Sequence, residues 1–121
     1  MISKISFLIL FTLTSLFSYS QSVEQKIDAL NKKIKETKSQ IKKSELHLEI
    51  AQLHFDEYDL ESSRIEAIKC YDGVGNKMDS IKMQSCKLLG IVYAYQDKTD
   101  TSLIYLHEAN QIGRSLNDST F

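Results

Sequence analysis

Histidine and acidic residues are the first candidates for chemistry in this sequence. His107-Glu108 begins as the helix of a zinc protease does, but Gln111 stands where the second metal-binding imidazole is needed. His47 and His54 are separated by about two helical turns, roughly 10 Å, which is too far for one ion to bridge. We therefore predict no metal site and no catalytic residues, and we do not expect an enzyme.

A glycine-containing segment is a candidate for nucleotide binding. Gly73-Val74-Gly75 leads to Met78, where a dinucleotide-binding fingerprint requires its third glycine, and it follows a helical pattern instead of a strand. We interpret the segment as a loop, and no cofactor is expected.

The two cysteines, Cys70 and Cys86, are equally far in sequence from Met78, near the middle of a turn expected between two antiparallel helices. They would lie at the same level along the two helix axes, so they could form a disulfide in an oxidising compartment. For a loop of this length, such a bond would stabilise the fold by about 3 kcal/mol. The alternative is a pair of buried free thiols that act as small apolar fillers. We favour the free thiols, because antiparallel packing does not guarantee the short Cβ separation that a disulfide requires.

The composition indicates which elements carry these residues. The chain has 121 residues, no proline and four glycines. It therefore has few of the turn-forming residues that an all-β fold needs. Its 15 basic and 16 acidic side chains are nearly balanced, so no global field attracts nucleic acid or an acidic membrane surface. We predict an all-α fold, and nucleic acid is not an expected partner.

The first twenty residues have the pattern of an export signal. Lys4 gives the N-terminal region a positive charge, and residues 5–17 form an apolar run. Ser18 and Ser20 then provide a small-x-small cleavage site. The run is shorter than the roughly 20 apolar residues that span a membrane. We predict a signal peptide over residues 1–20, an exported chain in the periplasm or cell envelope, and no stable membrane span after cleavage.

Residues 21–43 are predicted to form a long amphipathic helix, or two abutting ones. Six lysines lie between Lys32 and Lys43, with Glu36 as the one acid among them. Such a run could suggest a polyanion or lipid surface, but the lysines occupy the polar face of an apolar stripe, which favours an ordinary solvated helix face. The stripe consists of Val23, Ile27, Leu30, Ile34, Ile41 and Leu48.

Two stretches of about 39 residues follow, and each has the pattern of a helix, a short turn and a second helix. The Asp-Ser pair at residues 79–80 recurs at residues 118–119, which indicates the period. We assign a degenerate repeat to residues 44–78, a clearer repeat to residues 79–117, and the start of a further repeat to residues 118–121.

The clearer repeat resembles the tetratricopeptide repeat. The resemblance is carried by Leu89-Gly90-x-x-Tyr93, the small Ser102, Leu106 and Ala109. In such a repeat, Gly90 and Ser102 sit where the two helices cross closely, and Tyr93 and Leu106 fill the groove beside them. The resemblance implies antiparallel helix-turn-helix repeats stacked as an α-solenoid, preceded by the amphipathic helix. The layout is similar to the exported sensory parts of bacterial tetratricopeptide signalling proteins.

The same resemblance implies a binding surface. In the family, the first helix of each repeat forms a concave surface that holds an extended or helical segment of a partner. Tyr95 is the leading single contact, because an aromatic ring with a polar tip buries a large area at small entropic cost; its alternative role is packing against the next helix. The outward positions are Gln84, Lys87, Ile91 and Tyr95, with Leu48, Gln52 and Phe55 as counterparts in the degenerate repeat.

We therefore expect a protein-interaction scaffold with a protein or peptide partner, used as the input or assembly module of an envelope signalling system. The chain ends where another repeat would begin, so we expect a fragment of a longer protein, or self-association through the uncapped last helix. The alternative function is a structural coiled-coil protein that self-associates. Lys38, Ser44 and Glu45 weaken it, because they interrupt the continuous apolar seam that a coiled coil needs.

Overall fold

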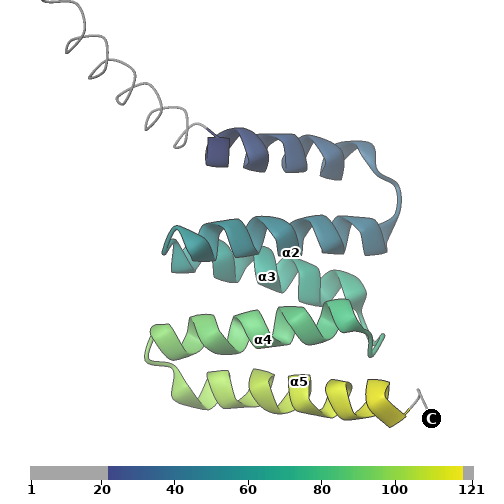
Figure 1. Ribbon diagram of the computed structural model, residues 1–121, viewed down its shortest axis with the longest axis vertical. Helices are drawn as coiled ribbons and strands as arrows, with labels where there is room; N and C mark the ends of the chain where they lie inside the picture. Colours follow the sequence, from purple (N-terminus) through teal and green to yellow (C-terminus); the bar gives the residue numbers. More distant parts are fainter. Residues whose placement is uncertain (1–21, 119–121) are drawn as a thin grey trace, which may run out of the picture.

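The computed structural model describes residues 22–118, and this part of the chain consists of helices joined by short turns, with no strand (Figure 1). A first helix over residues 22–36 is followed by α2 (Gln40–Asp56), α3 (Leu60–Val74), α4 (Ser80–Tyr95) and α5 (Thr99–Asp118). The predicted all-α fold is confirmed for these residues. The predicted signal peptide and the last residues, 119–121, lie outside the described part.

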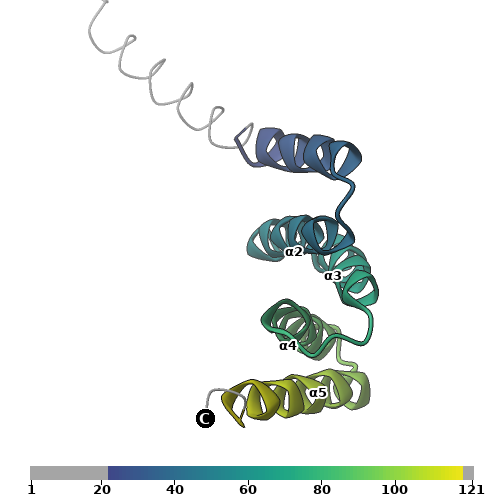
Figure 2. The same cartoon turned by 90° about the vertical axis from the view of Figure 1, so that its right-hand side faces the viewer.

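The helices stack in chain order from the first helix to α5, and neighbours along the chain run in opposite directions (Figure 1). α3 packs on both α2 and α4, α5 packs on α4, and α2 also touches α4 directly. Turned by 90°, the stack has α2 and α4 on one side and α3 on the other (Figure 2). Two helices that are not consecutive in the sequence are therefore brought side by side.

The structure has a break within residues 21–43, where one long helix or two abutting ones are predicted, and the next helix begins before Ser44, the predicted start of the first repeat. The first helix ends at residue 36, and α2 begins at Gln40 after a three-residue break. Ser39 caps α2, because its hydroxyl accepts a hydrogen bond from the Lys42 amide at 3.2 Å. Ser44 is fully buried inside α2. Ile41 lies beyond the break and is 37% exposed, so it does not continue the apolar stripe of the first helix.

The two hairpins, α2–α3 and α4–α5, have the same turn. Tyr58 and Asp97 occupy equivalent places, 39 residues apart, and both have a left-handed backbone, with φ of 60° and 59°. In both turns the amide of the next residue donates to the carbonyl five residues earlier, at 2.9 Å. An internal repeat of 39 residues is therefore present in the backbone as well as in the sequence.

The two helices of each hairpin are also joined by equivalent buried hydrogen bonds. Ser63 Oγ donates to the Ala51 carbonyl at 2.8 Å, and Ser102 Oγ donates to the Gly90 carbonyl at 2.6 Å. Each donor is 12 residues from its acceptor. A serine hydroxyl can reach the backbone of the neighbouring helix only where the two helices are close together. These contacts mark equivalent close approaches of the helices in the two hairpins.

A central apolar cluster joins α2, α3 and α4. Its buried members are Ala51, Ala67, Leu88, Leu89 and Val92. Smaller clusters join the first helix to α2 and α4 to α5. The burial of these side chains supplies most of the stability of the stack, since helices in proteins are stabilised mainly by the packing of their apolar faces.

We expect Gly90→Ala and Gly113→Ala to change stability in opposite directions. An added Cβ at Gly90 would lie 2.5 Å from Leu106 Cδ2, whereas one at Gly113 would meet nothing closer than Met83 Sδ at 3.5 Å. Gly113→Ala should raise the free energy of unfolding by about 0.5–1 kcal/mol through helix propensity. Gly90→Ala should lower it by about 1–2 kcal/mol, because overpacking exceeds the same propensity gain. Urea unfolding followed by circular dichroism measures both, and an equal gain in the two variants would contradict the close crossing.

Candidate binding groove between α2 and α4

An open groove of about 620 Å³ lies between α2 and α4. These two helices are on the same side of the stack (Figure 2). Its lining residues from α2 follow one helical face at i, i+3, i+4 and i+7, as expected for a single stripe. They are Glu45, Leu48, Glu49 and Gln52 from α2, with Ile81, Gln84, Lys87 and Leu88 from α4.

The floor of the groove is apolar and its edges are polar. Leu88 is buried in the central cluster, and Leu48 packs against that cluster while remaining partly exposed. Glu49 on α2 and Lys87 on α4 place opposite charges on the two edges. Glu45 forms an ion pair with Lys42 at 3.5 Å, but both side chains are exposed, so this pair restrains the edge only weakly.

Four of the seven residues expected to bind a partner line this groove, namely Leu48, Gln52, Gln84 and Lys87. The sequence interpretation missed Glu45, Glu49, Ile81 and Leu88. Each of these lies three or four residues from a residue that was named, so helical spacing around the named positions could have found them.

The other three expected contacts, Phe55, Ile91 and Tyr95, lie outside the groove lining. The Phe55 and Tyr95 rings meet edge to face with centroids 5.9 Å apart, and they come from the last turns of α2 and α4. Tyr95 therefore packs on the neighbouring helix, although it remains 63% exposed, while Ile91 is 42% exposed. This ring pair ties the two helices together next to the groove.

The residues expected to pack the clearer repeat lie along the α4–α5 contact. Leu89, Gly90, Ser102 and Ala109 are buried, and Tyr93 and Leu106 are partly buried. The Tyr93 ring stacks on Tyr105, with centroids 5.6 Å apart and an interplanar angle of 9°.

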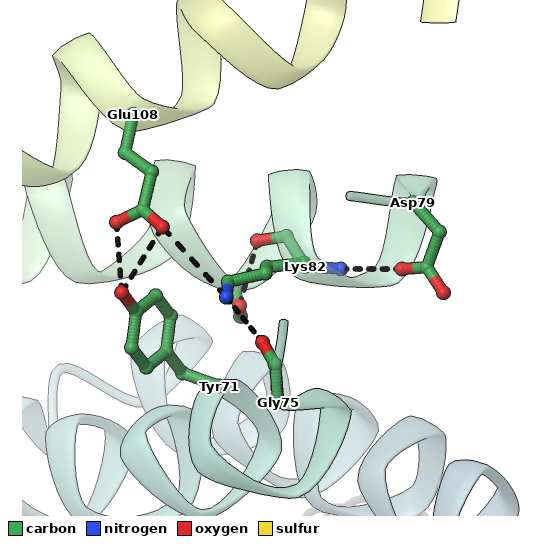
Figure 3. Close-up of polar contacts among 6 residues, drawn as sticks. Tyr71, Gly75, Asp79, Lys82 and Glu108 are labelled. Carbon is green, nitrogen blue, oxygen red and sulfur yellow. Dashed lines mark hydrogen bonds and ion pairs between the residues drawn. The ribbon is translucent and has the colours of Figure 1, made fainter. Parts of the chain in front are cut away.

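A partly buried polar cluster joins α3, α4 and α5 (Figure 3). The Tyr71 hydroxyl donates to the Glu108 carboxylate, 2.8 Å from one oxygen and 3.0 Å from the other. Lys82 Nζ lies 3.8 Å from Glu108 and 4.8 Å from the centre of the Tyr71 ring, and it donates to the Gly75 carbonyl. Burial and the bond to Glu108 raise the pKa of Tyr71. The phenol therefore remains a donor, and the cluster connects three helices.

His47 and His54 each contact a different carboxylate. His47 Nδ1 lies 2.6 Å from Glu66 Oε2 and joins α2 to α3, whereas His54 Nδ1 lies 3.6 Å from Asp59 Oδ2 at the following turn. Across residues 22–118, no three His, Cys, Asp or Glu side chains are grouped so that they could hold a metal ion.

Cys70 and Cys86 are both fully buried, and both are free thiols. The disulfide considered from the sequence is not present in this structure. Burial is the main cause that raises the pKa of each thiol to about 12, and the Glu108 carboxylate also raises that of Cys86. The two thiols are therefore protonated and unreactive at neutral pH.

None of the helices between residues 22 and 118 has the length and apolar character needed to cross a membrane. No protein-family model, no curated protein and no solved structure matches this chain.

Proposed function

We propose that this chain is an exported protein-interaction scaffold of the tetratricopeptide type, and that the groove between α2 and α4 binds a segment of a partner protein. The observation that carries the proposal is the groove itself, which has an apolar floor and is formed by the first helix of each of two equivalent hairpins. The module would provide the input or the assembly contact of an envelope signalling system.

The internal repeat supports the tetratricopeptide part of the proposal. Equivalent left-handed turn residues and equivalent serine-to-backbone bonds recur at an interval of 39 residues. Stacked helical hairpins of this kind use the surface of their first helices for recognition. The groove lies between the two corresponding helices, α2 and α4.

The size and chemistry of the groove support a peptide segment as its occupant. A volume of about 620 Å³ is within the range of sites that bind specific ligands. Leu48 and Ile81 offer apolar contact on the floor, while Gln84 on the edge can donate and accept hydrogen bonds. A short segment with one or two apolar side chains would bury them there and leave its backbone near the polar edges.

The packing of the first helix favours this proposal over a self-associating coiled coil. Ile27, Leu30 and Ile34 pack against α2, in a cluster with Leu46 and Ile50. A coiled coil would need that apolar stripe for a second chain.

Selection from a phage-displayed library of random peptides tests the groove. We expect the protein to enrich peptides that share an apolar motif, and we expect the variant Leu48→Gln/Ile81→Gln to bind a selected peptide at least about tenfold more weakly, because about 1.4 kcal/mol of apolar contact is removed. Fluorescence anisotropy measures the affinity. The matched control is Leu103→Gln/Ile104→Gln, which removes two exposed apolar side chains from α5 and should leave binding unchanged.

Two results would count against the groove. One is a selection that enriches no peptide above background. The other is equal weakening by the groove variant and the α5 variant while both retain the helical circular dichroism spectrum of the unchanged protein.

A further inference from the structure

The charges of the chain are divided unevenly between its two ends. Residues 22–43 contain seven lysines and three acids, whereas residues 44–118 contain seven basic and thirteen acidic side chains. The first helix and the start of α2 are therefore basic, and the rest of the described chain is acidic.

The structure gathers most of these lysines at one place. The first helix packs along α2 through Leu30 and Leu46, and the turn at residues 37–39 reverses the chain between them (Figure 1). The end of the first helix, the turn and the first turn of α2 thus lie together at one end of this helix pair. We call the exposed side chains there the lysine surface; they are Lys32, Lys33, Lys35, Lys38 and Lys42.

This placement is unfavourable for the fold alone. Lys42 follows the N-terminus of α2 and the first turn of α2 contains no acid, although the positive end of a helix dipole favours acids. The like charges of the lysine surface also repel one another, and the Lys42–Glu45 pair at 3.5 Å is exposed. The break at residues 37–39 places these lysines on two helices and the turn between them, so they do not share the polar face of one helix. An anionic partner would relieve the repulsion.

The composition of this region favours a lipid surface over a nucleic acid. Residues 22–43 contain no arginine, histidine or aromatic side chain. Arginine forks and aromatic rings are the groups that recognise bases and bind single strands. Lysine ammonium groups are compact point charges that attract any array of phosphates without a fixed geometry, and clustered lysines are attracted to membranes rich in anionic lipid.

We propose that the lysine surface binds the phosphate headgroups of an anionic phospholipid membrane. None of its five lysines lines the groove between α2 and α4. The two surfaces are therefore separate, and a chain held at a membrane by the first would still present the second to a partner.

Vesicle flotation with the full chain tests this proposal. The apolar residues 5–17 can enter any vesicle, whatever its charge. The quantity to measure is therefore a ratio at low salt: binding to vesicles with about 30% phosphatidylglycerol, divided by binding to vesicles of pure phosphatidylcholine. We expect a ratio of at least about ten, which falls towards one when the ionic strength is raised to about 0.3 M. The variant Lys32→Gln/Lys35→Gln/Lys38→Gln should also bring the ratio close to one.

The control variant Lys69→Gln/Lys77→Gln/Lys98→Gln has the same net charge and changes three exposed lysines outside both the lysine surface and the groove. It should retain the ratio of the unchanged protein. A ratio near one for the unchanged protein would overturn the proposal, as would an equal loss in both variants. Binding to a DNA duplex as tight as to the anionic vesicles at the same salt concentration would overturn it in favour of general polyanion binding.

Discussion

Replacement of Glu108 by alanine is expected to lower the free energy of unfolding by about 3 kcal/mol. The Lys82 side chain is 10% exposed and would lose its carboxylate, while the Tyr71 hydroxyl would lose its acceptor. A buried charge without its partner is strongly destabilising, and an unsatisfied hydroxyl adds to the cost. Glu108 itself is 29% exposed, so water reaches the site, and the loss should lie at the lower end of the range for buried pairs.

Urea unfolding of a small set of variants separates the two contributions. Glu108→Gln retains an acceptor for Tyr71 but no charge, so its loss should be smaller than that of Glu108→Ala. Adding Lys82→Met to Glu108→Ala removes the unpaired ammonium group and should recover part of the stability. If Lys82→Met makes Glu108→Ala still less stable, the ammonium group is solvated and this account of the cluster is wrong.

Raising the pH from about 8 to about 10 is expected to reduce the free energy of unfolding by about 3 kcal/mol. The ordinary pKa of a cysteine thiol is 9.0, and burial raises the pKa of Cys70 and Cys86 to about 12 in the folded protein. Above pH 9 the unfolded chain therefore releases protons that the folded chain retains. The stabilisation is complete below about pH 9 and is lost as the pH rises towards 12, by roughly 1.4 kcal/mol per pH unit for each thiol.

Burial also raises the pKa of Tyr71 and Tyr105, so the loss should steepen once unfolded tyrosines ionise above about pH 10. Thermal unfolding in the presence of a reductant, followed by circular dichroism at several pH values, measures the effect. The variant Cys70→Ala/Cys86→Ala should be less stable at pH 8 but nearly independent of pH up to about 10. A pH dependence unchanged by this double substitution would show that the thiols are not its source.

The helical character of the chain could be predicted from its sequence. The absence of proline, the apolar spacing and the 39-residue period are local properties of the chain. The close crossing at Gly90 could also be anticipated, because a tight helix contact needs a residue without a side chain. The break was expected near Ser44, and its position at residues 37–39 was not located because the cap at Ser39 competes with a helical pattern that continues on both sides of it.

Which side chains share a site depends on how the helices pack, and the sequence did not reveal it. Tyr71 and Glu108 are 37 residues apart in the sequence and belong to helices with no common local pattern, so their contact depends on how α3, α4 and α5 pack. The groove likewise exists because α2 contacts α4 directly, although α3 lies between them in the sequence. The Phe55–Tyr95 ring contact, which links α2 to α4, likewise depends on how these two helices pack. Helical periodicity shows which face of a helix is apolar, but the neighbour that covers this face is decided by the packing of distant segments.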